Sequence, residues 1–237
     1  MIKSPFIRYN KRYNNILFIT MQNFKDKVEV HVPTTVMQRQ HSDTNELNEH
    51  LLNIIADLES RYKDTGQNEV NSQTITTMGG YQTPTKVNFL DLDNKHIQDF
   101  RKNIIMPAIE TYLQHHFKEA AKQVDPYPNA WANILHKGDW QAPHCHPSHG
   151  TIASGCYYIK MPKGLKNPEG CIEFLTPNLE SWHHGFAYNR RVEPKEGMVV
   201  LFPPWYQHYV HPFKKDDTRA IIAFDVLPQR PGGNFVF

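Results

Sequence analysis

Three histidines stand close together in the segment Ala142–Gly150, whose sequence is APHCHPSHG. Neutral imidazole is a common ligand for iron, copper, nickel and zinc. His144 and His146 are two positions apart, and two such residues on a β-strand point to the same face. Both can therefore bind one metal ion. His149 falls outside this alternation, and we expect it to be a loop residue.

A third protein ligand has to come from elsewhere in the chain. The downstream candidates are His183 and His184 in SWHHGF, and His208 and His211 in PPWYQHYVHP. His208 follows a strong strand signal and a turn, which places it at the entry of the next strand. His183 and His184 lie in a polar, turn-like stretch. The spacing therefore favours a metal site made of His144, His146 and His208.

Arg219 opens RAIIAFDV, a run that is apolar enough to be buried. An arginine is almost never fully buried without a partner. A bound carboxylate would satisfy it, because the guanidinium group matches carboxylate geometry with two parallel hydrogen bonds. The alternative is an ion pair within the chain, with Asp216, Asp217 or Asp225, and both interpretations stay open at this point.

The elements that hold these residues divide the chain into two halves. In residues 1–125, apolar residues recur at three- and four-residue steps from Asp43 to Tyr62 and from about Asn94 to Ala121, which predicts two long helices. Pro107 should kink or split the second helix. In residues 126–237, seven or eight short β-rich runs alternate with Gly, Pro and Asn turns.

The β-rich half predicts a sandwich, a barrel or a jelly roll. Since no linker-like stretch separates the two halves, we expect one domain over residues 1–237. It would be an α+β, mainly β fold, with residues 126–237 as the core and residues 1–125 as a helical support region. The two helices would pack against one sheet of the core.

Composition narrows the class of protein. The net charge of +2 gives no sign of nucleic-acid binding. No run approaches the roughly 18 apolar residues that a membrane helix needs, and the first residues lack the apolar core of a signal peptide. The three cysteines are few and odd in number, which favours thiols in a reducing cytoplasm, that of the host if the protein is viral. Oligomeric state has no sequence signal here.

Over about residues 131–227 the chain resembles the iron(II)- and 2-oxoglutarate-dependent oxygenases, above all their small phage and bacterial branch and then the prolyl hydroxylases. Gly138 precedes His144 by six residues, and position 146 follows two beyond, as in that family's metal motif. SGCYYIK, EGCIEFLTP and KEGMVVLFPPWYQHYVHP resemble later motifs in the right order.

The resemblance implies a double-stranded β-helix, or jelly-roll, core that binds Fe(II) and the cosubstrates 2-oxoglutarate and O2, with ascorbate as an optional reductant. His144, His146 and His208 would hold the metal. Arg219 would grip the C5 carboxylate of 2-oxoglutarate, and the cosubstrate pocket would also contain Tyr158, Ser154 and Asn133. The implied activity is hydroxylation of a C–H bond in a small-molecule or peptide substrate, with release of succinate and CO2.

One position departs from the family pattern. The usual triad has two histidines and one carboxylate, but residue 146 is histidine. Either the site has three histidines, or a carboxylate from elsewhere completes it. Glu173 and Asp139 are the nearest candidates in the sequence.

Two other functions stay open. Gly138, His144 and His146 also resemble the opening of a cupin motif, and a cupin-type three-histidine dioxygenase or isomerase would not use 2-oxoglutarate. The motif's glutamate is absent, since Gly150 and Thr151 stand where it is expected. The third alternative is a jelly-roll binding protein without enzymatic activity, in which the histidines are incidental.

Overall fold

The computed structural model describes residues 34–62, 76–83, 87–146, 150–175 and 189–230, together with the two short strands β1 (Thr20–Met21) and β2 (Phe24–Lys25). The chain divides into two units, Met1–Pro33 and Thr34–Phe237. In the first unit, β1 and β2 form an antiparallel pair. The second unit holds all the other elements. A single domain over residues 1–237 stays a prediction.

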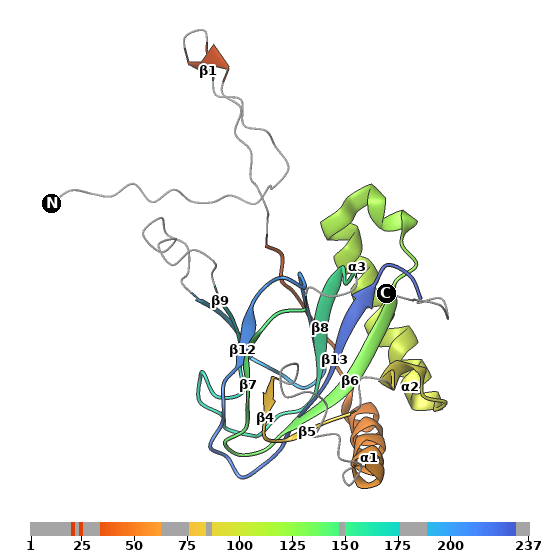
Figure 1. The fold of residues 1–237 in the computed structure, drawn as a ribbon, viewed down its shortest axis with the longest axis vertical. Coiled ribbons are helices and arrows are strands. Elements are labelled where there is room, and N and C mark those ends of the chain that lie inside the picture. Colours follow the sequence, from red (N-terminus) through yellow and green to blue (C-terminus); the bar gives the residue numbers. More distant parts are fainter. Residues whose placement is uncertain are drawn as a thin grey trace, which may run out of the picture. The chain divides into compact units, whose positions relative to one another are not determined.

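The second unit is mainly β, with two antiparallel sheets (Figure 1). The six-stranded sheet has the spatial order β3 (Met37–Gln40), β11 (Met198–Phe202), β8 (Ala153–Lys160), β13 (Arg219–Leu227), β6 (Tyr127–Leu135) and β5 (Tyr81–Gln82). The five-stranded sheet has the order β10 (Asn189–Val192), β9 (Ile172–Leu175), β12 (His208–Val210), β7 (Trp140–His144) and β4 (Thr77–Met78). Apart from the pair β9 and β10, successive strands from β6 to β13 alternate between the two sheets.

The expected helical pair is found in a different form. The first helix is α1 (Asn45–Tyr62), which begins two residues after the predicted start. The second predicted helix is composite: α2 (Lys95–Phe100), a π-helical turn η3 (Arg101–Ile105) and α3 (Met106–Phe117) follow one another without a break. Two 3-10 turns flank it, η2 (Phe89–Asp91) and η4 (Lys118–Gln123).

Pro107 explains the π-helical turn. A proline inside a helix lacks the N–H that would bond four residues back, and its ring crowds the preceding turn. Here the N–H of Met106 bonds to the carbonyl of Arg101, five residues back, so the helix widens just before the proline. The predicted kink or split is therefore realised as a π-helical turn, and Pro107 itself lies at the start of α3.

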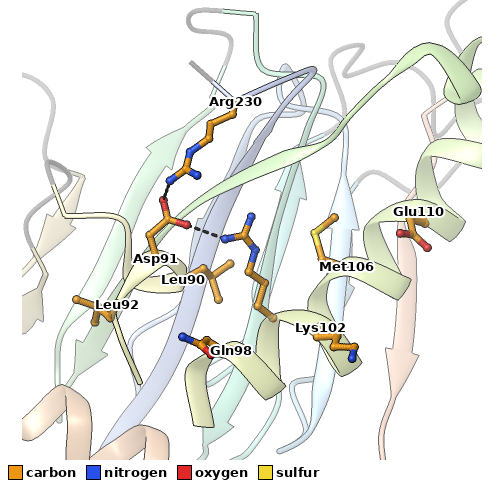
Figure 2. A pocket seen from close by; sticks show the side chains of 9 residues that line it. Leu90, Asp91, Leu92, Gln98, Lys102, Met106, Glu110 and Arg230 are labelled. Carbon is orange, nitrogen blue, oxygen red and sulfur yellow. Dashed lines mark hydrogen bonds and ion pairs between the residues drawn. The ribbon is translucent and has the colours of Figure 1, made fainter. Parts of the chain in front are cut away.

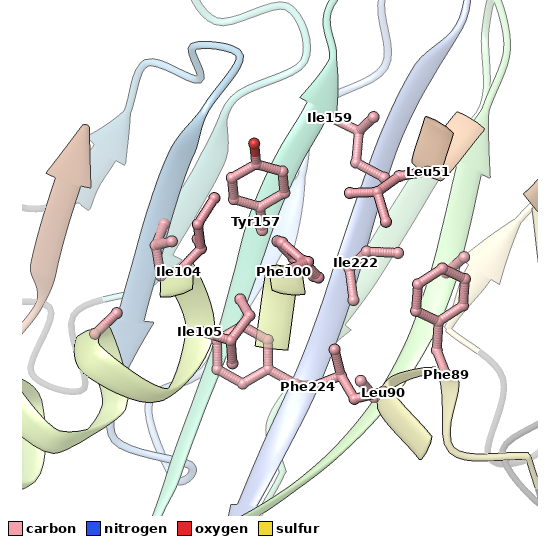
Figure 3. Packing of buried hydrophobic residues seen from close by; sticks show 14 of the residues in the cluster. Leu51, Phe89, Leu90, Phe100, Ile104, Ile105, Tyr157, Ile159, Ile222 and Phe224 are labelled. Carbon is pink, nitrogen blue, oxygen red and sulfur yellow. The ribbon is translucent and has the colours of Figure 1, made fainter. Parts of the chain in front are cut away.

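The helices cover one face of the six-stranded sheet. Buried residues of α1, α2 and α3 pack with outward-facing residues of β6, β8, β11 and β13 into one core, of which Figure 3 shows Leu51, Phe100, Tyr157, Ile222 and Phe224. Hydrogen bonds also tie α1 to β8, because the Tyr157 hydroxyl donates to Asn48 Oδ1 at 2.7 Å.

Gly155 allows strand β8 to lie close to its neighbours. A Cβ at this position would be 2.5 Å from the Val200 carbonyl oxygen and 2.8 Å from the Phe224 ring. Because both sit on neighbouring strands of the same sheet, neither can move away cheaply. The glycine of SGCYYIK is thus required for packing.

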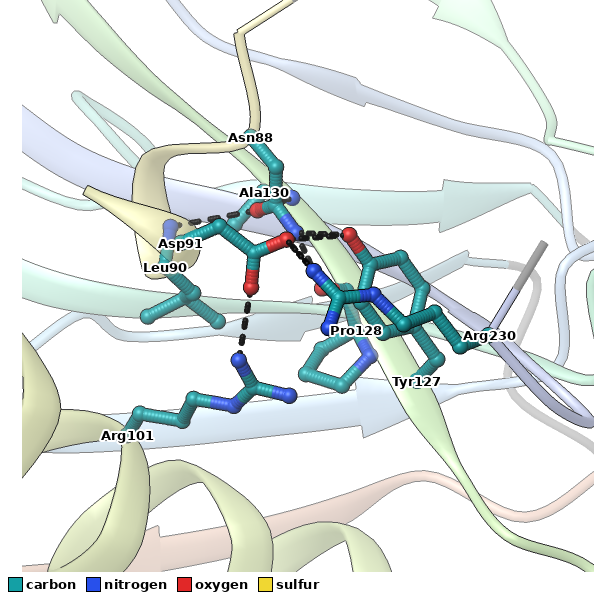
Figure 4. A network of polar contacts seen from close by, with 8 residues as sticks. All are labelled: Asn88, Leu90, Asp91, Arg101, Tyr127, Pro128, Ala130 and Arg230. Atoms are coloured by element: carbon teal, nitrogen blue, oxygen red, sulfur yellow. Dashed lines mark hydrogen bonds and ion pairs between the residues drawn. The ribbon is translucent and has the colours of Figure 1, made fainter. Parts of the chain in front are cut away.

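An ionic network ties the helices to the ends of β6 and β13. Asp91 on η2 pairs with Arg101 at 2.7 Å and with Arg230 at 3.1 Å, and it accepts a hydrogen bond from the Tyr127 hydroxyl (Figure 4). Asn88 donates to the same hydroxyl at 2.8 Å. The network therefore fastens the segment that follows β13 to the helical layer.

Candidate metal and cosubstrate site

The three predicted histidines come together between the sheets. His144 is the last residue of β7, His208 is the first residue of β12, and the two strands pair so that these residues lie opposite each other. His146 lies two residues beyond the end of β7, not on the strand as the alternation argument assumed. One potential ligand atom from each histidine lies within 4.8 Å of the others, and this is the only such group of His, Cys, Asp or Glu in the described part of the chain.

Each of the three rings is held through its Nδ1 atom. His144 Nδ1 is 2.7 Å from the carbonyl oxygen of Ala142, and His208 Nδ1 is 2.9 Å from that of Tyr206. His146 Nδ1 is 3.1 Å from Asp225 Oδ1. An oxygen acceptor at Nδ1 fixes the proton there and leaves the lone pair of Nε2 for a metal. The three rings are therefore in one tautomer, and it is the tautomer of metal ligands.

Burial disfavours the charged form of two of these rings, those of His144 and His208. It lowers the pKa of His144 to about 4 and the pKa of His208 well below its usual value of 6.5. Only the neutral ring can bind a metal, since the imidazolium form has no free lone pair. At neutral pH the site thus offers ligands without first having to lose protons.

The carboxylate nearest the histidines is Asp225, which the sequence analysis considered only as a partner of Arg219. It lies on β13 opposite Ser154 of β8, and the Ser154 hydroxyl donates to its Oδ1 at 2.6 Å. In this structure the Ser154 hydroxyl binds Asp225, so it leaves no unpartnered donor in the site. The sequence signal that could have pointed to Asp225 is its even spacing from Arg219, which puts both residues on the same face of β13.

The two carboxylates suggested by the sequence are used elsewhere. Glu173 is fully buried, and it binds His211 at 2.5 Å and the guanidinium of Arg191. Asp139 accepts a hydrogen bond from the N–H of His136 at 2.8 Å. Neither belongs to the group of three histidines. Residues His149, His183 and His184 lie outside the described residues.

Three other predicted residues lie on the inner face of the six-stranded sheet. Asn133 of β6 and Tyr158 of β8 are both paired with Ile221 of β13, one on each side. Arg219 lies two residues before Ile221 on the same strand, with its guanidinium carbon 5.3 Å from the centre of the Tyr158 ring. These side chains are 1 % exposed or less.

One polar atom of each of these three side chains is left without a hydrogen-bond partner. Arg219 donates through Nε to the carbonyl oxygen of Gly170 at 3.2 Å, but its Nη1 has no hydrogen-bond partner, and neither has the Tyr158 hydroxyl or Asn133 Oδ1. The ion pair weighed for Arg219 is not seen among the described residues, where Asp217 binds Lys160 instead. Since burying unpaired polar atoms is costly, these atoms indicate that a polar ligand belongs beside them.

Aromatic side chains line the rest of the histidine site. The Trp131 ring stacks towards His146 with 6.1 Å between ring centres, and Phe202 contacts His208 at 4.7 Å. Trp205 is 39 % exposed, and the carbonyl oxygen of its neighbour Pro204 accepts a hydrogen bond from the His146 N–H. Trp205 therefore lies near the histidines and is open to solvent, whereas Tyr206 is buried.

A hollow of about 480 Å³ is separate from this site. It lies among the helices, lined by Leu90, Met106 and several charged residues (Figure 2). Asp91 in its wall pairs with both Arg101 and Arg230. These three charged groups therefore serve the network that anchors the helical layer.

The part of the chain that matches known proteins contains the residues of this site. Residues 129–225 match the model of the family described as "Putative 2OG-Fe(II) oxygenase". Over this segment the chain is therefore similar to the 2OG-Fe(II) oxygenases. It spans β6 to β13 almost completely and contains all three histidines, Tyr158 and Arg219. The resemblance found in the sequence is confirmed, and the cofactors of the family are iron(II) and 2-oxoglutarate.

Solved structures with a similar fold include a prolyl-4-hydroxylase from Pseudomonas putida (TM-score 0.53, 14 % identity, 82 % of this chain and 93 % of that one). A second is the viral collagen prolyl hydroxylase of Paramecium bursaria Chlorella virus-1, solved with 2-oxoglutarate (TM-score 0.52, 12 % identity, 82 % of this chain and 96 % of that one). A third is HygX from Streptomyces hygroscopicus, solved with nickel, 2-oxoglutarate and hygromycin B (TM-score 0.51, 10 % identity, 82 % of this chain and 83 % of that one). No curated protein sequence matches the chain. None of the described helices is long and apolar enough to span a membrane.

Proposed function

We propose that this protein is an Fe(II)- and 2-oxoglutarate-dependent dioxygenase that hydroxylates a C–H bond of a small-molecule or peptide substrate. One O2 and one 2-oxoglutarate would be consumed for each hydroxyl group formed, and succinate and CO2 would be released. The observation that carries the proposal is the unpartnered pair of buried polar atoms, Arg219 Nη1 and the Tyr158 hydroxyl, in the same inter-sheet space as the three grouped histidines. The strand order β6 to β13 supports a jelly-roll core.

The histidine group fits iron. His144, His146 and His208 would each use Nε2, because their Nδ1 atoms are engaged by oxygen acceptors. When bound, the iron and 2-oxoglutarate would supply the chemistry that activates O2. The protein's part would be to hold the metal with three histidine nitrogens and to keep the surroundings dry with Phe202 and Trp131.

The orphaned atoms fit 2-oxoglutarate. Arg219 would donate from Nη1 to one end of the dicarboxylate, and the Tyr158 hydroxyl would donate to the same carboxylate. Asn133 lies in the same row of the sheet and would use its side-chain amide once rotated, since its present Nδ2 bond to Thr77 is 3.0 Å long. A carboxylate there would neutralise a buried charge, so binding should be strong for so small a ligand.

The substrate would enter beside the histidines. Exposed Trp205 and the half-buried Trp131 offer apolar contact area close to His146. The reducing compartment expected from the sequence fits the three free cysteines, so we place the reaction in the cytoplasm.

A cupin-type metalloprotein is the second candidate, and the all-histidine ligand group favours it. It has no use for a buried arginine with an unpartnered nitrogen. Turnover that does not need 2-oxoglutarate and survives Arg219→Ala would support the cupin alternative. A chain that takes up no metal would support a binding protein instead.

Succinate release tests the proposal. The full chain is loaded with Fe(II) without oxygen, then given 2-oxoglutarate and air, with and without a library of amino acids, peptides and small metabolites. The expected result is slow succinate formation alone and faster formation with the true substrate class. Folded, iron-loaded protein that forms no succinate under any of these conditions would overturn the assignment.

A further inference from the structure

The three histidines differ in what holds them. The Nδ1 partners of His144 and His208 are backbone carbonyls, each two residues earlier in the chain. His146 alone is held by a charged group, because its Nδ1 is 3.1 Å from the carboxylate of Asp225. A carboxylate at Nδ1 makes an imidazole a stronger electron donor to a metal than a carbonyl does.

Asp225 is itself held in place. Ser154 lies directly opposite it on β8 and donates its hydroxyl to Oδ1, the same oxygen that faces His146. The Asp225 side chain is 18 % exposed, and that of His146 is 15 % exposed. The contact between His146 and Asp225 is therefore largely shielded from solvent, where a negative charge acts more strongly on its neighbours.

The charge balance of the metal site gives this contact a role. Non-haem iron(II) oxygenase sites usually contain one carboxylate among three ligands. In the described part of the chain the ligand group is three histidines, and Asp225 is not a member of it. Among the described residues, the carboxylate in contact with the group therefore lies behind one imidazole and is not itself a member of the ligand group.

We propose that Asp225 is a positioning residue that fixes the His146 tautomer and supplies, through that ring, the negative charge that the ligand group lacks. The inference rests on the proposed function, since it assumes that the histidines bind a metal ion. Ser154 then acts as an anchor of Asp225. Because its hydroxyl binds Asp225, Ser154, the serine of SGCYYIK, would support the metal ligands rather than 2-oxoglutarate.

Metal affinity tests the proposal without any need for turnover. Fe(II) and Co(II) binding to the metal-free full chain is measured by competition with a chelator under anaerobic conditions. Asp225→Asn keeps the shape and removes the charge, and it should weaken binding roughly 10- to 100-fold. It should also shift the visible absorption bands of the Co(II) form, while Asp225→Glu restores part of the affinity. Asp217→Asn, which removes a carboxylate paired with Lys160, is the matched control and should change neither readout.

A double-mutant cycle asks whether the effect passes through His146. His146→Asp places a carboxylate at the ligand position, so in that background Asp225→Asn should change the affinity less than about threefold. An equal loss in both backgrounds would overturn the proposal, as would an Asp225→Asn variant that matches the wild type in affinity and Co(II) spectrum. A wild-type chain that binds neither metal would instead remove the proposed function itself. If His146→Asp does not fold, the single Asp225→Asn variant with its spectrum still decides the question.

Discussion

His208 lies directly opposite His144 where β12 pairs with β7, and the centres of the two rings are 4.3 Å apart. Backbone hydrogen bonds of the sheet therefore set the spacing of two of the proposed ligands, and each ring is further fixed by a carbonyl two residues earlier. His146 joins them from the segment that follows β7, and its ring is parallel to that of His208, with 5.3 Å between the ring centres. Two of the proposed ligands are thus fixed by the sheet, and the third by a side-chain contact.

Loss of either sheet-bound ligand should abolish stable metal binding. For His208→Ala or His144→Ala we expect a loss of Fe(II) affinity above the roughly 100-fold that removal of an outer partner can cost. Metal content after anaerobic reconstitution and gel filtration measures it. His136→Ala is the control, because His136 is exposed and outside the group of three. Retention of full iron content by His208→Ala would contradict the site.

Two adjacent tyrosines should respond in opposite ways to the loss of a hydroxyl group. The Tyr158 hydroxyl is buried without a partner, so Tyr158→Phe should leave the free energy of unfolding unchanged or raise it, and weaken 2-oxoglutarate binding by up to about tenfold. The Tyr157 hydroxyl donates to Asn48, so Tyr157→Phe should cost about 1 kcal/mol of stability and leave 2-oxoglutarate binding unchanged.

Urea unfolding and calorimetric titration with 2-oxoglutarate separate these two outcomes. The comparison is well controlled, because the two residues are neighbours on β8 and face opposite sides of the same sheet. Reversed effects would place the cosubstrate outside the inter-sheet space.

Arg219 should stabilise the protein that has bound 2-oxoglutarate and destabilise the protein without this ligand. Its buried guanidinium has one nitrogen without a partner, and a buried charge without full compensation costs free energy. Arg219→Met should therefore raise the melting temperature of the protein without 2-oxoglutarate, and it should remove the further rise that 2-oxoglutarate gives to the wild type. Thermal unfolding with and without the ligand measures both. Arg61→Met, on the exposed surface of α1, is the control; a ligand-induced rise retained by Arg219→Met would contradict the assigned contact.

Much of the site was predictable because its signals are local. The strands that carry Tyr158, Arg219 and the run before His208 are apolar and bounded by turn residues, so their positions follow from the pattern. Apart from the assumption that His144 and His146 share a strand, nothing in the pattern indicated strand β7, since WQAPH mixes polar residues with a proline; its strand state comes from pairing with β12 and β4. Strands β4 and β5 likewise lie in a stretch that is polar and rich in turn residues.

The contacts that could not be predicted are those between distant segments. Pro107 indicated a disturbed helix, but only packing decides between a break and a π-helical turn. Asp225 was a candidate partner of Arg219, yet six residues along β13 amount to about 20 Å, and the carboxylate lies at the histidines instead. The sequence shows that Asp225 is present, but it does not show whether Asp225 pairs with Arg219 or with the histidines near the other end of β13.

The metal-free protein should lose stability between pH 6.5 and 4. Burial lowers the pKa of His144 to about 4 and that of His208 well below 6.5. In this window the unfolded chain binds protons on these rings and the folded chain does not, so the free energy of unfolding falls as the pH falls. His144 alone should account for roughly 3 kcal/mol of this loss.

Urea unfolding in the presence of a chelator, repeated from pH 7 to pH 4, measures this slope. Carboxylates also begin to titrate at the acid end, so the comparison is made with the double variant His144→Gln, His208→Gln, which keeps every carboxylate. The difference between the two proteins should grow as the pH falls from 6.5 to 4. Parallel curves would mean that these rings are as easily protonated in the folded chain as in the unfolded one, contrary to their burial between the sheets.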